Sequence, residues 1–194
     1  MDATAQATAY LIYVWIRGIH PMLWRRFLVR AESTLADLHC VIQIGFGWTD
    51  FHLHRFRIRK KSYTVPRIGM MEGHDARTVK LADLTFRMNE RFLYEYDFGD
   101  LWQHEIRIEQ QCVMERGRTY PVCVGGKWAG PPEDCGGPDA FLERRSDHRF
   151  ACKRSWTKLR MTSQPAIWKR LNIGSTNCNR GGSGSGWIAS IDER

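Results

Sequence analysis

The sequence lacks most of the features that identify a function quickly. Its longest apolar stretch, Ala9 to Ile16, is less than half of the roughly 20 residues that a membrane-crossing helix requires, and its N-terminus does not show the pattern of a signal peptide. It contains no Gly-x-Ser-x-Gly, Gly-x-Gly-x-x-Gly or Walker motif. These absences argue against common hydrolases and nucleotide-binding proteins, and they lead us to expect a cytoplasmic protein.

Cysteine is sparse and shows no metal-binding spacing. Six cysteines in 194 residues are too few for a disulfide scaffold, and none of them forms a Cys-x-x-Cys pair. They are Cys40, Cys112, Cys123, Cys135, Cys152 and Cys178. We therefore expect reduced thiols, with a metal role open for two of them.

The net charge of +8 comes from the C-terminal part of the sequence. Residues 144–194 contain 11 Lys/Arg against 3 Asp/Glu, whereas residues 1–143 contain 18 of each. A basic excess favours a nucleic-acid partner, but a basic tail is often only a solvated segment. We predict one domain over residues 1–143 and a basic, atypical and poorly ordered tail over residues 144–194.

The first third of the chain shows clear periodicity. Apolar β-formers from Ala9 to Arg17 predict a strand buried on both sides, and Trp24 to Ala31 alternates as its hairpin partner. Apolar residues from Leu35 to Phe46 recur at helical spacing after a hydroxyl N-cap. The segment His52 to Lys60 alternates again and predicts a third strand.

The remainder of the domain contains a second hairpin and long loops. Residues 62–77 lack a period and predict a surface loop, and the runs Arg91 to Tyr96 and Trp102 to Gln110 predict two paired strands. A Gly/Pro-rich stretch follows Tyr120 and precedes a short helical segment near Asp139 to Arg144. The sequence thus predicts an α+β fold: a mixed or antiparallel sheet of five to six strands, one long packed helix and a loop-rich C-terminal side.

Five ordered motifs resemble a known family. They are Trp24-Arg25-Arg26, the helix from Leu38-His39 to Gly47-Trp48, the run His52 to Phe56, the run Tyr94 to His104, and Pro121-Val122-Cys123 followed by Pro131 to Gly137. By these motifs the chain is identified as a member of the plasmid pRiA4b ORF-3-like family, also labelled a transposon passenger (TnpR-type) protein. The resemblance implies a compact α+β domain carried on plasmids, transposons and bacterial chromosomes, without an activity to transfer. Residues 145–194 depart from the helical, acid-containing C-terminal region of the family, as a frameshifted or truncated end would.

Histidines and cysteines supply the strongest candidate for a metal site. Imidazole and thiolate are zinc ligands, and two of the histidines point to one face of the predicted third strand. The candidate ligands are His52, His54, His104, Cys123 and Cys135. The competing interpretation is that the histidines bond backbone carbonyls and that the cysteines are small buried apolar groups.

Carboxylates in turns form a second candidate set. Asp97, Asp100, Glu133 and Asp134 could serve acid/base chemistry or bind a hard cation. Turn and helix-cap geometry accounts for the same residues, because carboxylates accept backbone N–H bonds at such positions.

Basic residues interleaved with aromatic ones form the third candidate set. A strand with alternating arginines could contact phosphates while its aromatic rings stack on bases; alternatively, the arginines are solvated and the rings belong to the core. The residues concerned are Arg25, Arg26, Arg55, Arg57, Arg59 and Lys60.

Two functional hypotheses follow from these sets. The first is a non-enzymatic accessory protein of a mobile genetic element that binds a protein or nucleic-acid partner. The second is a metal-dependent enzyme with a His/Cys zinc site and Asp100 or Glu133 as the base.

Overall fold

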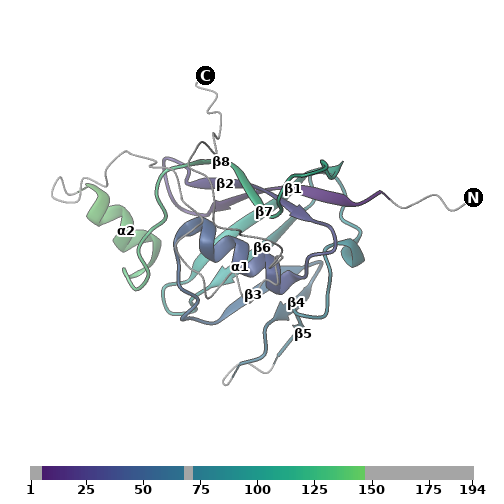
Figure 1. Cartoon of the computed structure of the whole chain (residues 1–194). Coiled ribbons are helices and arrows are strands. Elements are labelled where there is room, and N and C mark those ends of the chain that lie inside the picture. The colour runs from purple at the N-terminus through teal and green to yellow at the C-terminus, as the bar shows by residue number, and fades with distance from the viewer. Residues whose placement is uncertain (1–5, 68–71, 147–194) are drawn as a thin grey trace, which may run out of the picture.

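An eight-stranded mixed sheet, with α1 packed across one face, organises the chain in the computed structural model (Figure 1). The structure describes residues 6–67 and 72–146. Its elements are β1 (Thr8–Ile16), β2 (Trp24–Arg30), α1 (Leu35–Phe46), β3 (His54–Ile58), β4 (Lys61–Thr64), β5 (His74–Asp75), a 3-10 turn (Ala82–Leu84), β6 (Arg91–Tyr96), β7 (Trp102–Val113), β8 (Val122–Lys127) and α2 (Gly137–Ser146). The strand order is β5-β4-β3-β6-β7-β1-β2-β8, and only the β4–β5 pair is parallel.

The sheet has one core face and one outer face. In β1, the alternate residues Ile12, Val14 and Ile16 are buried, whereas Tyr13 and Trp15 are half-buried on the opposite side. The sequence predicted that both sides of this strand are buried, whereas the structure buries one side fully and the other only in part. Tyr13, Trp15 and Trp24 lie half-buried on the outer face, where arginine side chains lie over their rings.

Helix α1 forms where its sequence predicts it. Thr34 and Asp37 make a capping box, in which each side chain accepts a hydrogen bond from the other residue's backbone N–H. The helix ends at Gly47, which has the left-handed conformation typical of a helix C-cap. Gly45 lets the helix approach the sheet, because a Cβ atom there would lie 2.3 Å from the ring of Phe27.

The strand count differs from the predicted five to six. β8 forms inside the predicted Gly/Pro-rich loop, where it pairs with β2 at the sheet edge, and β4 and β5 lie largely within the predicted loop 62–77. Short edge strands escape detection because their periodicity covers too few residues. The short helical segment predicted near residue 139 is present as a second helix, α2, which is ten residues long.

The predicted tail lies almost entirely outside the described residues, so the division into a domain and a tail stays a prediction. Among the described residues, no helix is long and apolar enough to cross a membrane.

Candidate functional site

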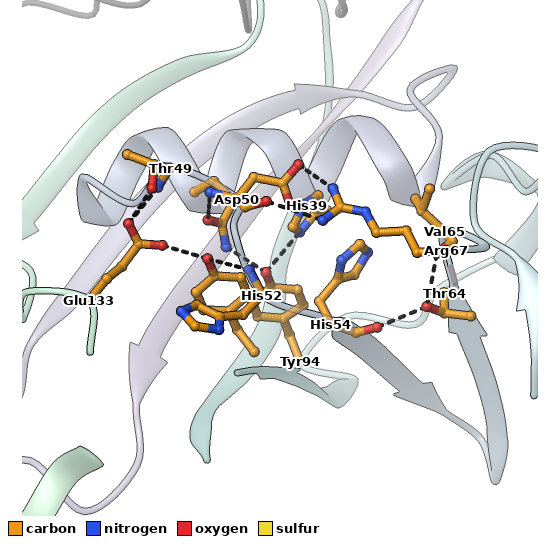
Figure 2. Close-up of polar contacts among 12 residues, drawn as sticks. His39, Thr49, Asp50, His52, His54, Thr64, Val65, Arg67, Tyr94 and Glu133 are labelled. Atoms are coloured by element: carbon orange, nitrogen blue, oxygen red, sulfur yellow. Dashed lines mark hydrogen bonds and ion pairs between the residues drawn. The ribbon is translucent and has the colours of Figure 1, made fainter. Parts of the chain in front are cut away.

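The loop between α1 and β3 gathers titratable side chains from distant parts of the chain. Asp50 lies between His39 and Arg67, and Thr49 at the start of the loop contacts Glu133 (Figure 2). His52, further along the loop, faces a second group of carboxylates. The loop therefore touches two separate clusters.

The first cluster is a buried hydrogen-bonded network. His39 bonds Asp50 through Nε2 and the hydroxyl of Tyr94 through Nδ1, each at 2.8 Å. The ring of His54 stacks on that of His39 with the centroids 3.5 Å apart, and burial holds the pKa of His54 well below its ordinary value. Burial alone would raise the pKa of Asp50, but hydrogen bonds and positive charge from His39 and Arg67 lower it.

This first cluster is better suited to holding the loop than to binding a cation. Ligand atoms of His39, Asp50 and His54 lie within 4.8 Å of one another. However, the guanidinium of Arg67 already pairs with Asp50, and its fixed positive charge opposes a metal ion at the same carboxylate.

The second cluster joins His52 to two aspartates. The Nε2 atom of His52 lies 2.9 Å from Oδ1 of Asp134, and its Nδ1 atom lies 3.6 Å from Oδ1 of Asp97. Although the first distance is short, Nε2 has no partner with hydrogen-bond geometry. The three residues together offer ligand atoms within 4.8 Å. The cluster is open to solvent on the side of Asp134, whose side chain is 72% exposed, whereas the Nε2 atom of His52 is buried.

A held glutamate lies beside the second cluster. One oxygen of Glu133 accepts hydrogen bonds from the backbone and side chain of Thr49, and the other accepts one from the hydroxyl of Tyr96 at 2.5 Å. Burial, and then the neighbouring carboxylate, raise the pKa of Tyr96, so its phenol stays protonated and remains a donor. Glu133 is therefore fixed in direction.

In the described part of the chain, no lysine or arginine side chain pairs with the carboxylates of the second cluster, or with Asp100 or Glu133. The two aspartates that face His52 also have left-handed backbone conformations, with φ of 55° at each. Aspartate tolerates this conformation in turns, so the backbone here requires small polar residues or glycine.

Backbone contacts bring the carboxylates of residues 130–137 to the loop. A Cβ atom at Gly130 would lie 1.9 Å from the carbonyl oxygen of Phe46. The indole of Trp48 donates to the carbonyl of Pro131 at 2.8 Å, and Gly136 donates to the side chain of Asp100 at 3.0 Å. These contacts account for the ordered Gly/Pro-rich segment without a zinc ion.

The structure does not bring the five sequence-predicted zinc ligands together. His52 and His54 belong to different clusters, and neither cluster of the described chain contains His104, Cys123 or Cys135. The sequence predicted that His52 and His54 share one face of a strand. They do not, because His52 lies in the loop before β3, whereas His54 is the first residue of β3.

Burial explains the other three predicted zinc ligands without a metal ion. His104 is packed among the rings of Phe46, Trp48 and Tyr94, and burial lowers its pKa to about 3. Burial also raises the pKa of the thiols of Cys123 and Cys135. These thiols stay protonated at neutral pH, which favours the interpretation of small buried groups.

The predicted carboxylates fulfil turn roles as well as facing the site. Asp97 accepts a hydrogen bond from the backbone of Gly99 at 3.0 Å, and Asp100 caps Gly136. His39 and Asp50 were not among the predicted site residues. The only signal for His39 was a polar side chain at a buried position of α1, a feature that it shares with Gln43 one turn further along the helix.

The predicted nucleic-acid contacts separate into three groups. Arg25 is buried on the core face, where Nε donates to Gly45 and Nη1 to Lys127 carbonyls at 2.8 and 3.1 Å; it is a structural residue. Arg59 pairs with Glu90 next to the β3–β4 turn, which also contains Lys60. The other three, Arg26, Arg55 and Arg57, lie on the outer face of the sheet.

The fold and site together define an α+β protein with one helix on a largely antiparallel sheet and a polar loop at the end of that helix. The chain belongs to the plasmid pRiA4b ORF-3-like protein family, whose pattern matches residues 8–149, and this confirms the resemblance seen in the sequence. It is 34% identical over 139 residues to the uncharacterized protein y4hQ of Sinorhizobium fredii, covering 71% of each chain.

A solved structure shares the fold. The crystal structure of MM3350, a protein of unknown function from Methanosarcina mazei Go1, matches with a TM-score of 0.66 and 33% identity, over 76% of this chain and 86% of that chain. These similarities establish the family and its fold, while the function rests on the site.

Proposed function

We propose that the chain binds a divalent metal ion of the zinc class through His52, Asp97 and Asp134. The observation that carries the proposal is the convergence of one imidazole and two carboxylates within 4.8 Å, at a place where no described arginine or lysine neutralises the carboxylates. Imidazole and carboxylate together suit zinc and neighbouring transition metals. The proposal keeps His52 from the sequence-predicted zinc ligands and replaces the others with carboxylates.

Three protein ligands also provide an arrangement for metal-dependent hydrolysis. A zinc ion held by three side chains retains a position for water, and the ion lowers the pKa of that water toward neutrality. Glu133 is adjacent in sequence to Asp134, and its carboxylate is oriented by Thr49 and Tyr96. In this enzymatic form of the proposal, Glu133 is the general base.

Substituting an aspartate of the centre is expected to weaken zinc binding without unfolding the protein. Asparagine retains the left-handed backbone and the turn hydrogen bond of Asp97 but loses the anionic ligand. Zinc titration of the untagged full-length protein by calorimetry should show a loss on the order of 100-fold or more in Asp97→Asn and in Asp134→Asn.

Two control variants test whether the loss of zinc affinity is specific to the proposed centre. Asp75→Asn removes a carboxylate that pairs with Arg77 outside the centre, and it should leave the zinc affinity unchanged. Asp50→Asn tests the other cluster. If zinc affinity fell in Asp50→Asn and was unaffected in Asp97→Asn and Asp134→Asn, the ion would belong to the His39 network and the proposed centre would be wrong.

The second candidate function is that of a non-enzymatic accessory protein that binds a protein or nucleic-acid partner. The observation that favours it is the outer face of the sheet, where Arg26 lies over the rings of Tyr13 and Trp24 at 4.9 and 5.1 Å from their centroids. Exposed arginine and aromatic side chains are typical of binding surfaces.

A further inference from the structure

We infer that the outer face of the sheet binds single-stranded nucleic acid, an inference that rests on the second candidate function and names its partner. The outer sheet face is made of alternate residues of β3, β6, β7, β1 and β2. Strand pairing places Tyr13 between Arg26 and Arg107, and Trp15 between Trp24 and Glu105. The face therefore has aromatic rings at its centre and charges around them.

Three rings form a continuous platform on this face. The ring centroid of Tyr13 lies 5.3 Å from those of Trp15 and Trp24. All three side chains are half-buried, although no described helix or strand packs over them. Nucleic-acid bases stack on such rings with little dependence on sequence, because every base presents a π-face.

Arginines extend the platform toward solvent. Arg107 lies 5.1 Å from the ring centroid of Tyr13, and Arg91 lies 5.6 Å from that of Trp15. The side chains of Arg91 and Arg26 are 55% and 40% exposed. A guanidinium plane over a ring leaves its outer side available to a base, and its N–H groups available to phosphate.

The charge of the face is complementary to a phosphate backbone. Three glutamates hold five arginines in place through ion pairs, as Glu109 holds Arg26 and Arg107, and they leave an excess of three positive charges among the charged residues of the outer face. These residues are Arg26, Arg30, Arg55, Arg57, Arg91 and Arg107 with Glu95, Glu105 and Glu109. A basic partner surface would be repelled by this excess, whereas the phosphates of a nucleic acid are attracted to it.

A single strand fits the face better than a duplex. Bases must be unpaired to lie flat on the guanidinium groups that cover the rings. Such a face offers stacking and phosphate contacts at once. In a duplex, the bases are stacked on one another and only the phosphates are accessible to a flat surface.

The test is oligonucleotide binding by the full-length protein, followed by fluorescence anisotropy. The probes are labelled oligo(dT) and a mixed-sequence RNA of about 20 nucleotides, and a duplex DNA of the same length. We expect the single strands to bind about tenfold more tightly than the duplex, and binding to weaken as salt rises. The fluorescence of Trp15 and Trp24 should be quenched on binding.

Matched variants locate the contact. Arg26→Gln together with Arg107→Gln preserves hydrogen bonding to Glu109 while it removes two charges, and Trp15→Thr removes a ring but keeps a strand-forming residue. Each should weaken single-strand binding about tenfold or more. Arg59→Gln is the control, because Arg59 also pairs with a glutamate and lies over a ring, that of Phe86, away from the platform.

Three outcomes would overturn the inference. The first is that single-stranded oligonucleotides do not bind at low salt. That result would leave the zinc site and a protein partner to be tested by their own experiments. The second is that the duplex binds as tightly as the single strands, which would show that the protein contacts phosphates and not bases. Binding that survives in the face variants but weakens in Lys153→Gln with Arg154→Gln would place the contact in the basic C-terminal segment.

Discussion

The free energy of unfolding is expected to fall steeply as the pH is lowered from about 6.5 toward 5. His54 and His104 are buried with depressed pKa values, that of His104 at about 3. In this pH range the unfolded chain binds a proton at each histidine and the folded protein does not, so acid favours unfolding. Each histidine contributes a slope of about 1.4 kcal/mol per pH unit. Chemical denaturation at a series of pH values measures this slope.

Removal of one buried histidine should halve this part of the slope. His104→Leu places an apolar side chain of similar size among the rings of Phe46, Trp48 and Tyr94, and it removes one of the two proton-binding sites. The slope, rather than the stability itself, is the readout, because the substitution also changes packing. Phe92→Leu, at another buried aromatic position of the core, changes packing without removing a titratable group and should leave the slope as it is. A wild-type stability that stayed level from pH 6.5 to about pH 5 would contradict the account.

Gly130→Ala is expected to destabilise the protein by about 3 kcal/mol or more. Its Cβ atom would lie 1.9 Å from the carbonyl oxygen of Phe46, and backbone atoms cannot move aside as a flexible side chain can. The loop would have to separate from the end of α1, and with it the hydrogen bond between Trp48 and Pro131 would be lost. The midpoint of urea unfolding measures the change.

A second glycine provides the comparison for this substitution. Gly117 has φ of +78° and open space around its Cβ position, so Gly117→Ala should cost only about 1–2 kcal/mol, from backbone strain alone. Equal effects of the two substitutions would show that close packing of the loop on α1 is not what positions Glu133 and Asp134.

Local sequence patterns predicted the elements that depend on local interactions. Helix α1 begins after Thr34 and ends at Phe46 as its spacing and cap indicated, and the hairpin of β6 and β7 forms around Asp97. The edge strands were missed because pairing with a neighbour, and not their own pattern, defines them. β8 contains two consecutive glycines, which on composition alone favour a loop.

The candidate site could be predicted only in part. His52, Asp97 and Asp134 were each singled out from residue chemistry, but they were assigned to two different sets. Their convergence depends on the loop of residues 130–137 docking on the hairpin and on α1, and this docking is determined by the space around glycines such as Gly130 and Gly137. Spacing along a sequence does not contain that information.

Thiols were grouped with the histidines because both are zinc ligands, yet their environment separates them. Cys135 is 3% exposed within the apolar core, and burial raises its thiol pKa. Cysteine is a common zinc ligand, but the residue type alone does not reveal how deeply each thiol is buried. Burial decides whether a thiolate is available to bind the ion.

The most direct test of the proposed metal centre is X-ray absorption spectroscopy of the zinc-loaded, untagged full-length protein. We predict a first coordination shell of nitrogen and oxygen only, from one imidazole, two carboxylates and water, at about 2.0–2.2 Å. The nitrogen contribution should disappear in His52→Gln. Sulfur scattering at about 2.3 Å would instead assign the ion to cysteines and contradict a centre formed by His52, Asp97 and Asp134.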